Sequence, residues 1–154
     1  MKTVYALQPI PKSIFLAGPT PRDEETPTWR PEALAILKSL GFDGTVFVPE
    51  SEDWKKHDRY EDQVEWEWRA LERAGVIAFW VPRDLTPNGE GSARMPAFTT
   101  NVEFGLHASS GKCLLGYPRG AAKMTYLDRL ARERNIPVYG TLDDLLRAAV
   151  DRAG

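Results

Sequence analysis

The chain has 154 residues, of which 42% are hydrophobic and 27% are charged, a composition typical of one globular domain with its own core. Its formal net charge of -2 leaves no basic excess for binding the backbone of a long nucleic acid, so we expect a small-molecule ligand. The single cysteine excludes an internal disulfide framework, and no segment approaches the roughly 20 apolar residues of a membrane span, so we expect a cytoplasmic protein without a membrane partner.

The predicted elements alternate between strands and helices along the chain. Short apolar runs that end at Gly or Pro predict buried strands, and longer segments with apolar residues at helical spacing predict helices. In chain order, the strands are 13–18, 45–48, 76–81, 113–117 and 137–139, and the helices are 29–40, 59–74, 99–110, 124–135 and 142–153.

This alternation indicates right-handed crossovers and a parallel sheet that is covered by helices on both faces. We therefore expect one α/β domain over residues 1–154, a flavodoxin-like three-layer sandwich with a five-stranded parallel sheet in the order 2-1-3-4-5. Residues 3–8 could add an edge strand. Residues 83–98 are rich in Pro, Gly and Asn and poor in apolar residues, which predicts a long loop that could act as a lid.

Ligands of open parallel sheets bind beyond the carboxyl ends of the strands. This rule selects the turn at Gly18 and Pro19, the loop after residue 81, the segment before Glu103, and residues 116–120. The chain has no G-x-G-x-x-G, P-loop or C-x-x-C motif, and its two histidines lack metal-ligand spacing. We therefore expect neither an organic cofactor nor a metal.

Glu103 is the most informative residue, and its surroundings allow two interpretations. Thr100 and Glu103 have the spacing of a capping box, which would make Glu103 structural. The same spacing places the carboxylate in the first turn of a helix, where the helix dipole would keep it ionised at neutral pH. An ionised carboxylate can attack an anomeric carbon.

Residues 101–105 (NVEFG), followed by Gly111-Lys112 and an apolar strand, resemble the nucleoside 2-deoxyribosyltransferase family. Residues 13–19 (SIFLAGP) are similar to the first strand and glycine turn of that family, and residues 68–80 to its helix and third strand. The likeness extends over residues 12–140, and residues 95–105 are most similar to a divergent, transferase-like branch.

The resemblance implies an enzyme that cleaves the N-glycosidic bond of a (deoxy)nucleoside or nucleotide. Glu103 would be the nucleophile, and the glycosyl-enzyme would react with a second base or with water. The family also places a substrate-orienting acid on the helix before the third strand. That position corresponds to Glu67, which borders the predicted buried face, with Glu65 as the fallback.

Two departures from the family pattern stand out. Phe15 replaces a tyrosine whose hydroxyl contacts the nucleophile in many transferases, and an acid that usually precedes the nucleophile falls near Ala97. Asp84, Asn101 or Glu67 could supply the missing acid or hydrogen bond. The expected catalytic residues are thus Glu103 and Glu67, and the expected substrate-binding residues are Phe15, Gly18, Pro19, Asp84 and Asn101.

Several other side chains have alternative roles. We expect Trp68 and Trp80 to pack in the core, and Trp54 could contact a substrate or a subunit. Arg22 and Arg30 could bind a 5′-phosphate. Four residues near the end of the fourth strand could form a pocket wall or a subunit interface: Tyr117, Lys123, Tyr126 and Asp128.

A second class of function fits the same sequence. A non-catalytic module could keep the fold and recognise a nucleotide as a signal, and the two departures favour that alternative. The resemblance also implies a homo-oligomer, a dimer or larger.

Overall fold

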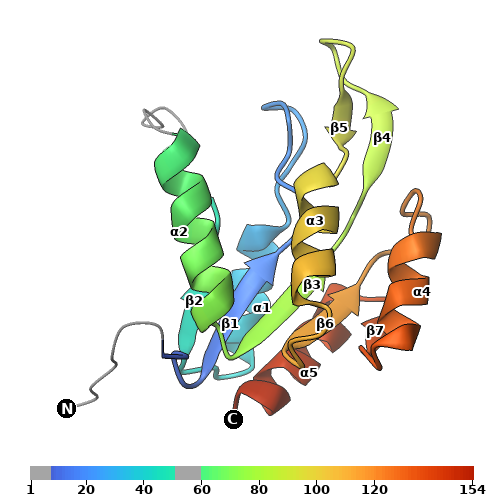
Figure 1. The fold of residues 1–154 in the computed structure, drawn as a ribbon. Coiled ribbons are helices and arrows are strands. Elements are labelled where there is room, and N and C mark those ends of the chain that lie inside the picture. Colours follow the sequence, from blue (N-terminus) through green and yellow to red (C-terminus); the bar gives the residue numbers. More distant parts are fainter. Residues whose placement is uncertain (1–7, 51–59) are drawn as a thin grey trace.

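The computed structural model describes residues 8–50 and 60–154 (Figure 1). The main sheet contains β1 (Ser13–Ala17), β2 (Thr45–Phe47), β3 (Val76–Trp80), β6 (Cys113–Gly116) and β7 (Val138–Tyr139). The helices are α1 (Arg30–Ser39), α2 (Tyr60–Arg73), α3 (Phe98–His107), α4 (Thr125–Glu133) and α5 (Leu142–Ala153). Trp54, and all but the last residue of the suggested edge strand 3–8, lie outside the described residues. No described helix is both long and apolar enough to cross a membrane.

The sheet order is β2-β1-β3-β6-β7, and every neighbouring pair is parallel. Counted within this sheet the order is 2-1-3-4-5, so the predicted flavodoxin-like α/β sandwich is confirmed. The order reverses at β1, between β2 and β3, and this is where the carboxyl ends of parallel strands leave room for a ligand.

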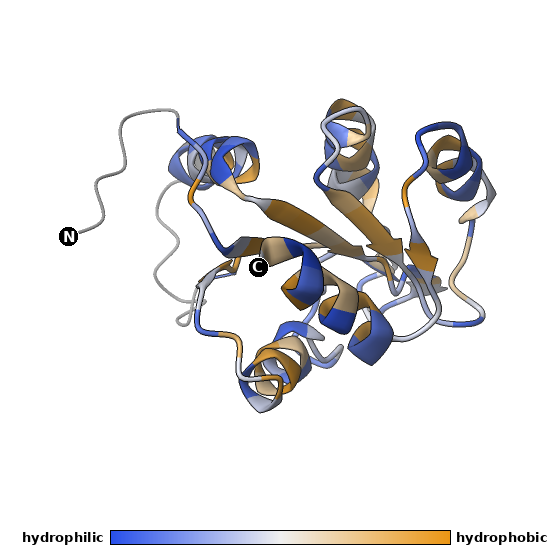
Figure 2. Ribbon diagram, turned by 90° about the horizontal axis from the view of Figure 1, so that it is seen from below, coloured by the Kyte–Doolittle hydropathy of each residue, from blue (hydrophilic) through white to orange (hydrophobic). Residues whose placement is uncertain are grey.

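Two hydrophobic clusters, one on each face of the sheet, hold the layers together. One packs side chains of β1, β3 and β6 against α2, α3 and α4, and the other packs the opposite faces of these strands against α1 and α5. Figure 2 shows the apolar sheet between these two helix layers. Every position of β1 and β3 is buried, because helices cover both faces of these strands, which explains why all their residues except Ser13 are apolar.

The predicted loop at 83–98 is wrong in part, because it contains an antiparallel hairpin of β4 (Asp84–Pro87) and β5 (Ala93–Met95). Asn88 forms the turn, since its side-chain oxygen accepts hydrogen bonds from the backbone N–H of Glu90 (3.0 Å) and Ser92 (2.9 Å). The backbone of Arg22 donates to the carbonyl of Arg94 (3.0 Å), which ties the β1–α1 loop to the hairpin. The hairpin stands above the carboxyl ends of the strands in Figure 1.

The expected core position of Trp68 is also wrong, because its side chain is 59% exposed, whereas Trp80 is buried as expected. The buried residues here are instead Ala70 and Leu71 of α2 and Ala74, which directly follows the helix. On a helix with 100° between residues, Glu67 lies within the face of these residues and Trp68 lies beside it. Glu67 therefore faces the interior of the protein.

Candidate active site

The glycine turn after β1 is held in place by the start of α1. A Cβ atom at Gly18 would lie 2.1 Å from the carbonyl oxygen of Trp80, so only glycine allows the turn to approach β3 this closely. The indole nitrogen of Trp29 donates to the carbonyl of Pro19 (3.1 Å). The turn is therefore rigid, and its backbone faces the ends of β1 and β3.

Arg30 is the centre of this arrangement. Its side chain is 1% exposed, and its guanidinium donates to the carbonyls of Leu16 (3.2 Å) and Gly18 (2.7 Å). It also forms a buried ion pair with Glu50, which follows β2 and accepts a hydrogen bond from the hydroxyl of Thr28 (2.8 Å). These contacts occupy the Arg30 side chain, so it is committed to the protein itself rather than to a 5′-phosphate.

Glu103 lies in the middle of α3 and is 8% exposed. The predicted first-turn position is wrong, because α3 begins at Phe98 and has no acidic residue in its first turn. Ala97 precedes the helix with a left-handed backbone (φ 59°), and Thr100 is buried inside the helix, so the expected capping box does not define the helix start. Glu103 is therefore one turn deeper in the helix and further from the positive end of its dipole.

Glu67 reaches the same region from α2. It is half-buried, and its carboxylate accepts a hydrogen bond from the side-chain amide of Gln63 (3.0 Å). Its expected substitute, Glu65, is exposed and forms an ion pair with Arg69 on the surface. The structure thus favours Glu67 over Glu65.

Glu103, Glu67 and Arg30 interact electrostatically. Burial, and next the negative charge of Glu67, raise the pKa of Glu103 to about 7, while the positive charge of Arg30 acts in the opposite direction. Burial likewise raises the pKa of Glu67, against the hydrogen bond from Gln63 and the charge of Arg30. The expectation that Glu103 stays fully ionised at neutral pH is therefore wrong, because burial and the charge of Glu67 raise its pKa into the neutral range.

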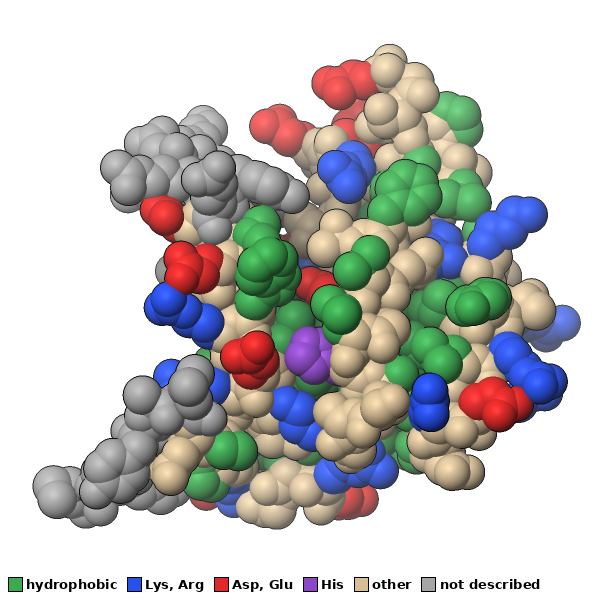
Figure 3. Space-filling model, in the orientation of Figure 1, with side chains coloured by type: hydrophobic (Ala, Val, Ile, Leu, Met, Phe, Trp, Pro, Cys, Tyr) green, Lys and Arg blue, Asp and Glu red, His purple; other side chains and the backbone are tan. Residues whose placement is uncertain are grey.

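The surface between α2 and α3 is hollowed in Figure 3, and acidic side chains are visible in the hollow. Three aromatic rings, from β1, β2 and α2, pack together. Phe15 stacks on Phe47 with ring centroids 6.3 Å apart, and Trp66 lies 6.3 Å from both rings. Phe15 is 1% exposed, so its ring is part of the apolar core.

The structure groups the other expected site residues elsewhere. The carboxylate of Asp84 accepts hydrogen bonds from the backbone (2.9 Å) and hydroxyl (2.6 Å) of Thr86, within the hairpin. The side-chain oxygen of Asn101 accepts a hydrogen bond from Arg83. Because Asn101 and Glu103 are two residues apart, about 200° around the helix, they face opposite sides of α3.

Sequence reasoning missed Glu50 and Arg83. Each lies three residues after the end of a sheet strand. Ligands bind at this edge of the sheet, so this position could have identified both residues as site candidates. Within residues 8–50 and 60–154, no group of three or more His, Cys, Asp or Glu side chains is placed to hold a metal ion.

Comparison with known families gives a match that covers this whole arrangement. A family described as "Nucleoside 2-deoxyribosyltransferase like" matches residues 11–121, from the start of β1 to the segment before α4. No curated protein matches the chain. The family match spans the glycine turn, Glu67, the hairpin and Glu103, and it includes more than two thirds of the sequence. The chain therefore belongs to the nucleoside 2-deoxyribosyltransferase-like family.

Proposed function

We propose that this protein cleaves the N-glycosidic bond of a nucleoside or nucleotide, with Glu103 as the nucleophile. The observation that carries the proposal is the buried Glu103 carboxylate, whose pKa is raised to about 7 by burial and by Glu67. A carboxylate with this pKa is present in both protonation states near neutral pH. Strongly perturbed acids in a hollow at the carboxyl edge of a sheet are typical of catalytic sites.

In the first step, an oxygen of ionised Glu103 attacks C1′ of the sugar. The C1′–N bond breaks, its electron pair passes to the base, and the base takes up a proton. The transition state carries positive charge on the sugar, which the ionised Glu103 carboxylate stabilises. The two acids interact, and in our proposal the reactive form is the one in which Glu103 is ionised and Glu67 holds the proton that passes to the base; burial, which raises the pKa of Glu67, favours this form.

In the second step, water or a second base attacks C1′ and breaks the ester bond to Glu103. Glu67, now ionised, accepts the proton of the incoming group, so both carboxyl groups return to their starting states. Hydrolysis and transfer share the first step and differ only in the group that resolves the intermediate.

The replacement of tyrosine by Phe15 changes which groups set the pKa of the nucleophile. A phenolic hydroxyl next to Glu103 would stabilise the anion, whereas the buried Phe15 ring offers no hydrogen bond. The buried Arg30 charge is the stabilising influence that acts on Glu103 here. The Gly18–Pro19 turn, which Arg30 holds, is our proposed contact for the substrate.

The test is a panel of deoxyribonucleosides, ribonucleosides and their monophosphates, incubated with and without a free acceptor base and analysed by chromatography. We expect base release or exchange by the wild type, and loss of turnover in Glu103→Ala and Glu103→Gln. Glu90→Gln, an exposed change on the hairpin, is the matched control and should keep full activity. Absence of turnover, with ligand binding unchanged in Glu103→Ala, would contradict the proposal and favour the nucleotide-binding module.

A further inference from the structure

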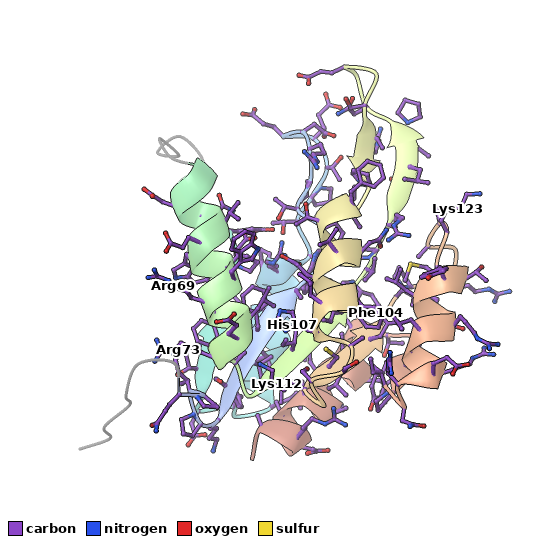
Figure 4. All side chains as sticks on the ribbon, in the orientation of Figure 1. Arg69, Arg73, Phe104, His107, Lys112 and Lys123 are labelled. Atoms are coloured by element: carbon purple, nitrogen blue, oxygen red, sulfur yellow. The ribbon has the colours of Figure 1, made fainter. Side chains whose placement is uncertain are left out.

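A second cavity, of about 350 Å³, lies between α3 and α4 beside the hairpin. Its walls include Phe104 of α3 and Leu127 of α4, and Lys123 lies at its edge. Figure 4 shows Phe104 and Lys123 on the two sides of this region. The volume is within the range of small-molecule sites, about 300 to 1,000 Å³.

This cavity is separate from the Glu103 site. Asn101 and Gly105 line it, and each is two residues from Glu103 in the helix. Residues two apart face opposite sides of a helix, so Glu103 faces away from the cavity. An inference about this cavity does not depend on the chemistry proposed for Glu103.

Arg83 places a buried positive charge at the cavity. It is 6% exposed, and its Nη1 donates to the carbonyls of Ala122 (3.4 Å) and Lys123 (2.8 Å). Its Nη2 donates to the side-chain oxygen of Asn101, and its buried Nε has no hydrogen-bond partner in the described structure. All of these acceptors are neutral.

A buried guanidinium usually forms an ion pair with a carboxylate, which compensates its charge. Arg30 has Glu50 for this purpose, whereas within the described residues Arg83 forms no ion pair with a carboxylate. Burial lowers the pKa of Arg83, as expected for a cation without a compensating charge. The uncompensated charge is a physical reason for an anion to bind in the adjoining cavity.

Gly105 keeps the cavity open. It is exposed to solvent and lies away from both ends of α3, where glycine is about 1 kcal/mol less favourable for the helix than alanine. A Cβ atom there would meet nothing within 4 Å, so packing inside the protein does not require glycine. A larger side chain at this position would project into the cavity that Gly105 lines.

We infer that the cavity between α3 and α4 is a second binding site, which takes a small monocarboxylate with an apolar body. Arg83 supplies the charge for the carboxylate, and Lys123 adds a second cation at the edge. Leu85, Phe98 and Tyr126 line the cavity with exposed apolar surface and supply the apolar contacts, and Tyr126 is 80% exposed. A carboxylate also accepts hydrogen bonds from a guanidinium more strongly than the Asn101 amide oxygen does.

The probe is 4-phenylbutyrate, compared with its neutral amide, titrated into the full chain by calorimetry and by amide NMR. We expect the acid to bind about tenfold more tightly than the amide. The shifts should lie on α3, α4 and the hairpin. Arg83→Gln should remove this preference, and Glu103→Gln should leave binding of the acid unchanged.

Arg83→Gln could also disturb folding, because Arg83 holds the segment before α4. Gly105→Leu avoids this ambiguity, since it should raise the melting temperature while it abolishes binding of the acid. Four results would overturn the inference: equal binding of acid and amide, binding retained in Gly105→Leu, binding lost in Glu103→Gln, or no binding at about 10 mM acid. A dimer that Gly105→Leu separates, with no binding of the acid, would assign the cavity to an interface between copies.

Discussion

Replacing Glu103 by glutamine should stabilise the protein at alkaline pH, although it removes the proposed nucleophile. The folded state raises the pKa of Glu103 from its ordinary value of 4.5 to about 7. The folded protein therefore holds this proton more tightly than the unfolded chain does. The associated stability is fully present below pH 4.5 and is lost as the pH rises through 7.

The size of the effect follows from the difference between the two pKa values. A shift from 4.5 to about 7 is about 2.5 units, and each unit corresponds to about 1.36 kcal/mol, which gives about 3 kcal/mol. Glu103→Gln does not lose this stability at high pH, because its side chain stays neutral. Its free energy of unfolding, relative to wild type, should increase by about 3 kcal/mol between pH 4 and pH 9.

Urea unfolding at a series of pH values measures this difference directly, and melting temperatures should shift by about 2 to 4 °C for each kcal/mol. Glu90→Gln is the control, because Glu90 is exposed and its replacement should leave the pH profile unchanged. A stability difference for Glu103→Gln that is independent of pH, or that decreases toward pH 9, would refute the reasoning.

Three further predictions concern the residues around this site. Glu67→Gln removes both the proposed proton donor and a negative charge that raises the pKa of Glu103, so kcat/KM should fall by about 10²- to 10⁴-fold and the acidic limb of the residual activity should lie at lower pH than in wild type, whereas exposed Glu65→Gln should change neither. Glu50→Gln leaves Arg30 buried without its ion pair and should reduce the free energy of unfolding by about 3 kcal/mol, measured in urea. Gly18→Ala forces a methyl group against the carbonyl of Trp80 and should cost about 2 kcal/mol or more in the same assay, while Gly89→Ala, in open space, should be nearly neutral.

Most of the fold could be predicted from the sequence because its strands are buried on both faces. Such strands are continuous apolar runs, and β1 and β3 stand out among the polar segments around them. The hairpin could not be recognised in the same way. Pro87 argues against a strand, β5 has only three residues, and the pairing contains a register irregularity, so no alternation of apolar and polar residues marks it.

The sequence predicted that two acids, Glu103 and Glu67, belong to one candidate site, and it did not predict their electrostatics. Glu103 and Glu67 were identified from their positions in a family pattern, and the structure places them where their charges interact. Whether a helical carboxylate is ionised depends on how far it lies from the helix start and how much water it loses. The left-handed backbone at Ala97 moves the helix start to Phe98, and one sequence does not show this.

Helix α3 lies between the two proposed sites. Its 100° rotation per residue turns Glu103 toward α2 and turns Asn101 and Gly105 toward α4. Between these faces, Phe104 is fully buried and packs edge-on against Phe79 of β3, with ring centroids 5.1 Å apart. A ligand on one face alters the other only if it binds better to a second arrangement of the helix. Since the Phe104–Phe79 contact fixes α3 to the central strand, the two sites should act independently.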